Sequence, residues 1–238
     1  MPERRKHRGP HPEDLRLFAP DAWPVLRAAA ADLAWLLSRD YAPASALKLV
    51  GDRYALVARQ RIAVARSTSS DAAARCRRDH EVPAGALAGR TLALDGYNVL
   101  TTVEAALAGG IILAARDGTY RDMASMHGSY RKVHETRPAL ELLGCTLAAL
   151  EVGQACWLLD RPVSNSGRLK QLMELLAAER GWPWRIELVS DPDAPLAVAE
   201  QVVATADSVI LDRCQAWFNL AKETIASLVP EARVVDLA

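Results

Sequence analysis

Apolar residues recur at helical spacing through the first quarter of the chain. The stretch from Val25 to Leu37 is rich in alanine and leucine, and Pro24 stands where the first turn of a helix accepts proline. Two further helical patterns follow, one ending at Gly51 and one over about residues 54–66. We therefore expect residues 12–66 to form a helical domain, and the Ser-, Pro- and Gly-containing residues 67–89 to form a linker with at most one short helix.

From residue 90 onwards, short apolar runs alternate with helical patterns. Strands are expected at 91–95, 155–160, 185–190, within 202–211, and at 233–237. Helices are expected at about 102–115, 136–149, 168–180 and 220–228. This alternation is typical of βαβ units. It predicts an α/β domain over residues 90–238 with a mainly parallel sheet, whose functional crevice lies at the carboxyl ends of its strands.

Composition narrows the class of protein. Half of the residues are hydrophobic and 24% are charged, and no apolar run reaches the ~18–20 residues that a membrane span requires. We therefore expect no membrane partner. Residues 1–11 are basic and lack a following apolar segment, which indicates a disordered tail and no signal peptide. The four cysteines are scattered without a Cys-x-x-Cys pair, which favours reduced, mostly buried thiols in the cytoplasm and argues against structural zinc.

The formal net charge of zero conceals an asymmetry between the two parts of the chain. Residues 1–90 carry a net charge of about +6, and residues 91–238 carry about −6. Such a division fits a basic module that holds a polyanion and an acidic module that processes it, although chance on solvated faces gives the same count.

Three apolar runs end on aspartates. They are Leu92–Asp95, Cys156–Asp160 and Val202–Asp207, the last being ambiguous because residues 209–212 also read as a strand. Aspartates gathered at one sheet edge repel one another unless a cation lies among them, and their hard oxygen atoms suit Mg²⁺ or Mn²⁺. The alternative for each is a turn or a helix N-cap, above all for Asp160, since Pro162 and a new helix follow.

Residues 116–131 are densely polar although they follow an apolar segment. Asp117 or Asp122 could supply a further metal ligand, and His127 could act as an acid or base. Arg121 and Arg131 could hold phosphate oxygens. A solvated connection whose charges pair with each other is the alternative.

Basic residues also gather in the helical part, where Arg53, Arg59 and Arg61 accompany Tyr54. Arginines and an aromatic ring on one surface suit a nucleic-acid backbone with an unstacked base. A solvated basic face is the alternative.

Two segments carry a resemblance to known families. Asp95-Gly96-Tyr97-Asn98 after a strand, together with Ala204-Thr205-Ala206-Asp207-Ser208, resembles the PIN-like superfamily of metal-dependent ribonucleases, and its NYN branch in particular. The late motif looks like a Thr-Ser-Asp with Ala206 in place of serine. Residues 46–54 and 59–61 look like a prokaryotic domain of unknown function that precedes a PIN-like domain.

The resemblance implies a three-layer α/β/α fold, with Asp95 and Asp207 as metal-binding acids and Asn98 orienting a ligand or water. A further acid, Glu104 or Asp117, would complete the set.

Three functions follow as hypotheses. The first is a ribonuclease that uses Mg²⁺ or Mn²⁺, in which Asp95, Asp207 and one of Glu104, Asp117 or Asp160 hold the metal and the products carry a 5′-phosphate and a 3′-hydroxyl. The second is an RNA-binding protein that keeps the fold and does not cleave. The third is a nucleotide-handling enzyme. Phe and Tyr are few, so structured RNA is the expected partner. The sequence leaves the oligomeric state open.

Overall fold

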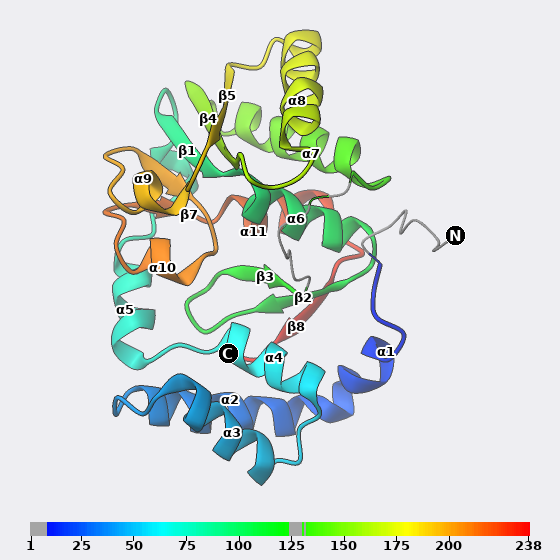
Figure 1. Ribbon diagram of the computed structural model, residues 1–238, viewed down its shortest axis with the longest axis vertical. Helices are drawn as coiled ribbons and strands as arrows, with labels where there is room; N and C mark the ends of the chain where they lie inside the picture. Colours follow the sequence, from blue (N-terminus) through cyan, green and yellow to red (C-terminus); the bar gives the residue numbers. More distant parts are fainter. Residues whose placement is uncertain (1–8, 124–129, 131) are drawn as a thin grey trace.

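The computed structural model describes residues 9–123, 130 and 132–238, and it places them in an α/β fold (Figure 1). The centre is a five-stranded sheet in which all neighbouring strands are parallel. In spatial order its strands are β5 (Trp184–Val189), β4 (Gln154–Asp160), β1 (Thr91–Asp95), β6 (Val202–Ala204) and β7 (Trp217–Phe218). The mainly parallel sheet predicted from the sequence is confirmed.

The central strand β1 fixes the geometry of the sheet. Leu94 pairs with Trp157 of β4 on one side and with Ala204 of β6 on the other. Leu92 and Leu94 face the main core, while Ala93 lies on the opposite face in a smaller cluster. Because side chains alternate along a strand, Asp95 shares the face of Ala93.

Helices cover both faces, which gives the three-layer arrangement that the resemblance implied. One layer contains α6 (Gly96–Leu107), α7 (Thr136–Ala149), α8 (Ser166–Arg180) and α11 (Leu220–Leu228). The other contains two short helices, α9 (Asp193–Ala197) and α10 (Ser208–Leu211). Figure 1 shows α8 to the right of β4 and β5, and α9 with α10 on the left.

The structure contains a second sheet, of which only the strand at 233–237 was predicted. Strand β2 (Ile111–Ala114) pairs antiparallel with β3 (Tyr120–Asp122) and parallel with β8 (Arg233–Asp236). The helix predicted at 102–115 is therefore wrong beyond Leu107. Gly109 adopts a φ of +73° and Gly110 follows it, so the helix ends there and the apolar residues beyond extend as a strand.

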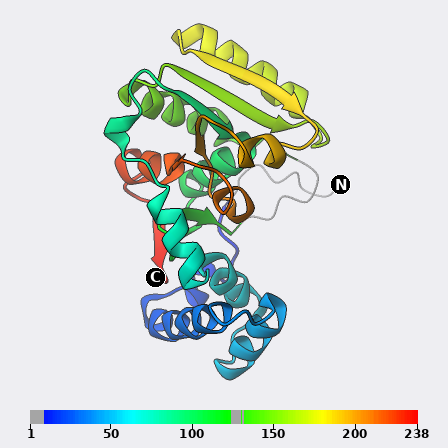
Figure 2. The same cartoon turned by 90° about the vertical axis from the view of Figure 1, so that its left-hand side faces the viewer.

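The N-terminal helices pack on this second sheet. They comprise α1 (Asp14–Leu17), η1 (Pro20–Ala22), α2 (Trp23–Leu37), α3 (Pro43–Arg53) and α4 (Ala58–Ser67). Leu26 and Val64 share one core with Leu113 and Val235 of β2 and β8. Figure 2 shows α2 to α4 at the far end of the molecule from the five-stranded sheet. The helical part thus buries its apolar face against strands from the second half of the chain.

The segment predicted as a linker is packed into the fold. It contains α5 (Asp71–Asp79), whose N-terminus is capped by the Ser70 hydroxyl, and η2 (Ala84–Ala86). Between them, the Val82 N–H donates to the Trp217 carbonyl at 2.8 Å, and the Trp217 N–H donates to the His80 carbonyl at 3.0 Å. Residues 80–82 therefore extend the five-stranded sheet beyond β7.

Two further observations concern the chain as a whole. Among the described residues, no helix combines the length and the apolarity that a membrane crossing needs. All four cysteines are free thiols, but only Cys214 is buried and Cys145 is exposed, so the prediction that most of them are buried is wrong.

Candidate functional site

Two aspartates lie where the strand order of the sheet reverses. The chain moves from β1 outwards to β4 and β5, and then returns to β6 on the other side of β1. Asp95 ends β1, and Asp207 follows β6 by three residues. Such a reversal point leaves a crevice at the carboxyl ends of the two strands, which is where open α/β sheets bind their ligands.

Thr205 connects these two aspartates. Its hydroxyl donates a hydrogen bond to Oδ2 of Asp95 at 2.8 Å, and it accepts one from the backbone N–H of Asp207 at 3.0 Å. The carboxylate of Asp207 accepts hydrogen bonds from the first N–H groups of α10, at 2.7 Å from Val209. Both acids are therefore held in fixed positions by the loop after β6.

Asn98 supports the same loop from the first turn of α6. Its Oδ1 accepts the backbone N–H of Ala206 at 2.9 Å. The structure therefore brings Asn98 together with Asp95 and Asp207, in a position that holds the backbone beside them. The resemblance had assigned Asn98 to a ligand or a water.

The electrostatics of Asp95 are unusual for a carboxylate. Its side chain is 7% exposed, and burial raises its pKa to about 7, with Asp207 and Asp193 adding to the rise and the Thr205 hydroxyl opposing it. In the described part of the chain, no Lys, Arg or His nitrogen lies within 4.0 Å of the carboxylates of Asp95, Asp193 or Asp207. The negative charge at the carboxyl ends of the strands, called the carboxylate edge below, is thus not neutralised by the described residues.

Two more carboxylates belong to the same edge. Asp160 ends β4 and is half-buried. Burial raises its pKa, and the negative charge of Asp191 raises it further. Asp193 begins α9. Burial raises its pKa, and the negative charges of Asp207, Asp191 and Asp160 raise it further. Asp193 was not among the predicted site residues. Its signal was the Asp-Pro-Asp at residues 191–193, directly after an expected strand.

The chemistry of this edge fits a hard divalent cation. Within residues 9–123, 130 and 132–238, no three Asp, Glu, His or Cys side chains are grouped closely enough to hold a metal ion. Mg²⁺, however, usually binds through one or two carboxylates and keeps several of its waters. Asp95 and Asp207 supply oxygen ligands of that kind, with a repulsion between them that a cation would relieve.

Asp117 is placed differently from the prediction. It is fully buried, and its Oδ2 accepts hydrogen bonds from Arg77 and Arg121, both at 2.7 Å. Its Oδ1 accepts the Thr119 hydroxyl at 2.7 Å. The neighbouring Arg121 guanidinium holds the pKa of Asp117 well below its usual range, against the effect of burial. Both oxygens are thus engaged inside the protein, and the assignment of Asp117 as a metal ligand is corrected to a buried ion pair.

Arg121 is corrected in the same way. It is 6% exposed, and besides Asp117 its Nε donates to the Ala206 carbonyl at 2.9 Å. Ala206 is therefore held from two sides, by Asn98 at its N–H and by Arg121 at its carbonyl. Arg121 positions the loop that contains Asp207 and is too buried to meet a substrate phosphate.

Two further predicted acids, Glu104 and Asp122, are buried and hydrogen-bonded inside the protein. Glu104 is fully buried and accepts hydrogen bonds from the Tyr130 hydroxyl and, at 2.6 Å, from the Thr136 hydroxyl. Asp122 is buried and accepts the Thr102 hydroxyl at 3.0 Å. Neither is among the groups that shift the pKa of Asp95. Arg131 and His127 lie outside the described residues.

The arginines predicted to bind substrate through the helical part are engaged with carboxylates. The three pairs are Arg53 with Asp32, Arg59 with Asp14, and Arg61 with Asp52. Two of these guanidinium groups also help to pack the helices. Asp14, the partner of Arg59, is fully buried, and Arg61 lies directly over Gly51, where a side chain would leave it no room. These arginines are therefore paired and not free, and their role in substrate binding stays a prediction.

Other arginines lie closer to the carboxylate edge. Arg161 directly follows Asp160 at the end of β4, is exposed, and donates to the Leu188 carbonyl at 2.8 Å. Arg213 lies just beyond α10 and is also exposed. Neither arginine was predicted as a site residue, although the position of each next to the end of an expected strand was the available signal.

Comparison with known proteins matches two parts of the chain to two separate family models. A family model described as "Domain of unknown function (DUF5616)" matches residues 84–223, and a model described as "Protein of unknown function (DUF434)" matches residues 25–80. The "Uncharacterized protein MJ0935" of Methanocaldococcus jannaschii is 30% identical over 184 residues, which cover 76% of this chain and 86% of that protein. No solved structure matches the chain significantly.

Proposed function

The chain belongs to the family described as Domain of unknown function (DUF5616), and we propose that it is a hydrolase that uses Mg²⁺ or Mn²⁺ to cleave phosphodiester bonds in RNA. One observation carries the proposal. Asp95 and Asp207 lie together at the reversal point of a parallel sheet, with no cation of the described chain beside them. Two aspartates at that position can bind a ligand, and no described cationic group balances their negative charge.

The raised pKa of Asp95 supports a role in binding a cation. A carboxyl group with a pKa of about 7 is partly protonated at neutral pH. A divalent cation between Asp95 and Asp207 would favour the charged form and release that proton. When bound, such a metal lowers the pKa of a coordinated water and stabilises charge on phosphoryl oxygens.

The residues around the two aspartates fix their geometry. Thr205 holds Oδ2 of Asp95, and Asn98 with Arg121 holds the backbone on the N-terminal side of Asp207. Catalytic groups held in advance avoid a cost of reorganisation during the reaction. Arg161 and Arg213 supply the exposed positive charge that a phosphodiester backbone requires near this edge.

RNA is proposed as the substrate from the resemblance of residues 95–98 and 204–208 to PIN-like ribonucleases. Structured RNA is favoured because the chain has only 2 Phe and 5 Tyr to stack on unpaired bases. The cytoplasm is proposed as the compartment because all four cysteines are free thiols.

The test is incubation of end-labelled RNA with the wild-type protein and with Asp95→Asn, each in Mg²⁺, Mn²⁺ or EDTA. We expect cleavage by the wild type alone, abolished by EDTA, with products that carry 5′-phosphates. Asp21→Asn, an exposed aspartate of η1, is the matched control and should cleave like the wild type. Cleavage that persists in Asp95→Asn would overturn the proposal.

A second candidate is an RNA-binding protein that does not cleave. It is favoured by the observation that the described residues contain no group of three metal-binding side chains. It predicts a salt-sensitive gel shift by both the wild type and Asp95→Asn, with no products in any metal. A nucleotide-handling enzyme, the third hypothesis, would instead be stabilised by a nucleotide and be indifferent to long RNA.

A further inference from the structure

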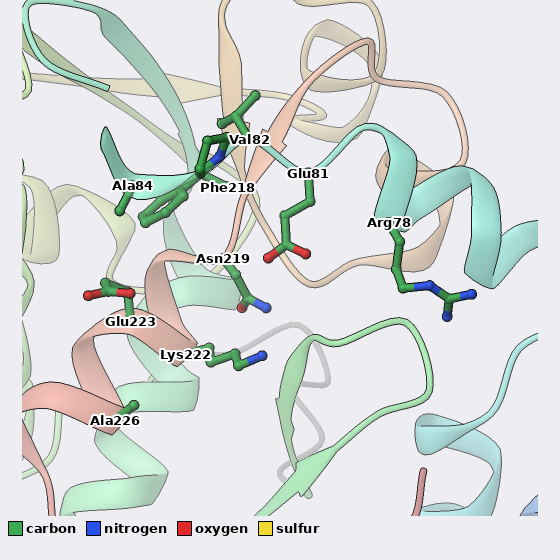
Figure 3. Close-up of a pocket in the computed structure, with 10 residues that line it drawn as sticks. Arg78, Glu81, Val82, Ala84, Phe218, Asn219, Lys222, Glu223 and Ala226 are labelled. Atoms are coloured by element: carbon green, nitrogen blue, oxygen red, sulfur yellow. The ribbon is translucent and has the colours of Figure 1, made fainter. Parts of the chain in front are cut away.

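A pocket separate from the carboxylate edge lies beside α11. Its volume is about 410 Å³, within the range of about 300–1,000 Å³ that small-molecule sites occupy. One wall is the segment between α5 and η2, and the other is the side of α11 (Figure 3). Its lining residues include Arg78, Glu81, Val82, Phe218, Asn219 and Lys222.

Three polar side chains line one side of the pocket. Figure 3 shows the ends of Glu81 and Asn219 near each other and Lys222 beside them, extended towards the neighbouring strand, where its Nζ lies 5.7 Å from the centre of the Tyr120 ring. Asn219 is 5% exposed and is held in place because its Nδ2 donates to the Gly118 carbonyl at 2.9 Å. The Glu81 carboxylate and the Lys222 ammonium group therefore lie on either side of the fixed Asn219 amide.

The charges of Glu81 and Lys222 are not neutralised by a contacting ion among the described residues, although Lys222 also faces the ring of Tyr120. In the described part of the chain, no Lys, Arg or His nitrogen lies within 4.0 Å of the Glu81 carboxylate, and no carboxylate lies that close to Lys222. Burial raises the pKa of Glu81, against the effects of Lys222 and Asn219. A half-buried carboxylate without a contacting cation gains from a ligand that donates hydrogen bonds to it.

The rest of the lining is apolar on one side and cationic at the rim. Val82, Pro83 and Phe218 form an apolar wall that can cover a flat ring. Arg78 is exposed, and Figure 3 shows its guanidinium directed away from the other polar side chains. A ligand that fits must present hydrogen-bond donors next to an acceptor, a flat body, and an anion at some distance.

We propose that this pocket binds a guanine nucleotide. Guanine carries the O6 acceptor, the N1–H donor and the N2 amino donor in a row on one edge. The two donors match the two oxygens of Glu81, the O6 acceptor matches Lys222, and the phosphate meets Arg78. The same group is present in free guanosine monophosphate and at the end of an RNA strand, and the inference holds whether or not the protein cleaves RNA.

The first experiment is calorimetry of the full chain with the 5′-monophosphates of guanosine, inosine, adenosine, cytidine and uridine. Guanosine monophosphate should bind tightest. Inosine monophosphate, which lacks only the N2 amino group, should bind about tenfold or more weakly, because one hydrogen bond to a charged acceptor is lost. Equal binding of all five, or no binding at millimolar concentration, would overturn the proposal without any variant.

Two variants then assign the contacts. Glu81→Gln should abolish the preference for guanosine over inosine monophosphate, and Lys222→Met should weaken binding of both. Glu231→Gln, an exposed glutamate outside the pocket, should leave the wild-type series unchanged. A Glu81→Gln protein that keeps the full preference would show that the base lies elsewhere.

Two more experiments test nucleotide binding independently of the proposed RNA cleavage. Asp95→Asn should bind guanosine monophosphate like the wild type, because Asp95 does not line the pocket. Short RNAs that end in 5′-phosphoguanosine, 5′-phosphouridine or unphosphorylated guanosine distinguish a strand end from a free nucleotide as the ligand. If only the free nucleotide competes, the pocket serves a small molecule and not RNA.

Discussion

The hydroxyl of Thr205 donates a hydrogen bond to the carboxylate of Asp95, across 110 positions of sequence. This bond opposes the rise in the pKa of Asp95 that burial causes, so it keeps part of the carboxyl population charged. Because the same hydroxyl accepts the Asp207 N–H, it also sets the position of the second aspartate.

Replacement of Thr205 by valine removes both hydrogen bonds with little change in shape. The pKa of Asp95 should rise further, so metal-dependent cleavage should require a higher pH than in the wild type, and activity at pH 7 should fall about tenfold or more. Thr205→Ser restores the hydroxyl and should restore the pH profile. A profile that is the same for valine and threonine would contradict this role.

Replacement of Asp95 by asparagine should stabilise the metal-free protein at high pH. The folded pKa of about 7 lies above the ordinary 3.8, so the folded state holds its proton more tightly, and the carboxyl lowers stability progressively as the pH rises from about 4 to 7. The gain on substitution should be near zero at pH 4 and as much as roughly 4 kcal/mol at pH 8. Urea unfolding in EDTA at both pH values measures it. An equal effect at the two pH values would show that Asp95 is not the titrating group.

Asp117 should behave in the opposite sense, because its pKa is lowered and not raised. Its contribution to stability is present above about pH 4 and is lost as the pH falls below that value. Asp117→Asn leaves Arg77 and Arg121 without their shared carboxylate and should cost about 3–5 kcal/mol in urea unfolding at pH 7. Asp236→Asn, which removes an exposed ion pair with Arg27, should cost about 1 kcal/mol or less.

RNA affinity should depend on arginines at the sheet edge and not on those of the helical part. Arg161→Gln and Arg213→Gln should each weaken binding and reduce the slope of log affinity against log salt by about 1. Arg59→Gln should leave affinity unchanged but should destabilise the fold by about 3–5 kcal/mol, because Asp14 would remain buried and unpaired. Filter binding over a salt series, with thermal unfolding of each variant, separates the two effects. Loss of RNA affinity in a folded Arg59→Gln protein would show that the helical part contributes to RNA binding.

Gly96 should not tolerate a side chain. A Cβ at this position would lie 2.5 Å from Leu159 Cδ2 and 2.8 Å from the Leu158 carbonyl, so β4 or the start of α6 must move. Gly96→Ala should cost about 1–3 kcal/mol and displace Asp95, lowering activity in the folded fraction. Gly167→Ala in α8 meets no atom within 4 Å and should be neutral or slightly stabilising. Equal stability of the two variants would contradict the close approach.

The sequence predicted the elements whose signal is local. The helix over residues 136–149 is confirmed as α7, and the strand over 91–95 as β1, because their periodicity covers the whole element. Strand β7 has two residues, too few for a pattern, and is recognised only by its pairing with β6 and residues 80–82. Strand β2 was missed because an apolar run of four residues after a helix reads as more helix. Strand β3 was missed because it is short and lies in the polar stretch that was interpreted as a connection.

The candidate site likewise contains residues that could be predicted from local sequence and residues that could not. Asp95 and Asp207 end or follow strands, so their convergence could be expected from topology alone. The burial of Asp117 between Arg77 and Arg121 could not, because its partners lie on α5 and β3 and meet only in the folded chain. Likewise, the charges of Arg53, Arg59 and Arg61 could be read from the sequence. The carboxylates that pair with them could be identified only from the contacts in the folded chain.

The pairing of β8 with β2 has a consequence for synthesis. Val235 and Leu237 belong to the same core as Leu26, and Arg27 binds Asp236 at a separation of 209 residues. The N-terminal helices leave the ribosome early, yet part of their apolar face stays uncovered until β8 has been made. At about 5–20 residues per second, that wait lasts roughly ten to forty seconds. During this time the nascent chain carries an exposed apolar surface that a chaperone can recognise, and a premature stop before β8 would leave the surface uncovered for good.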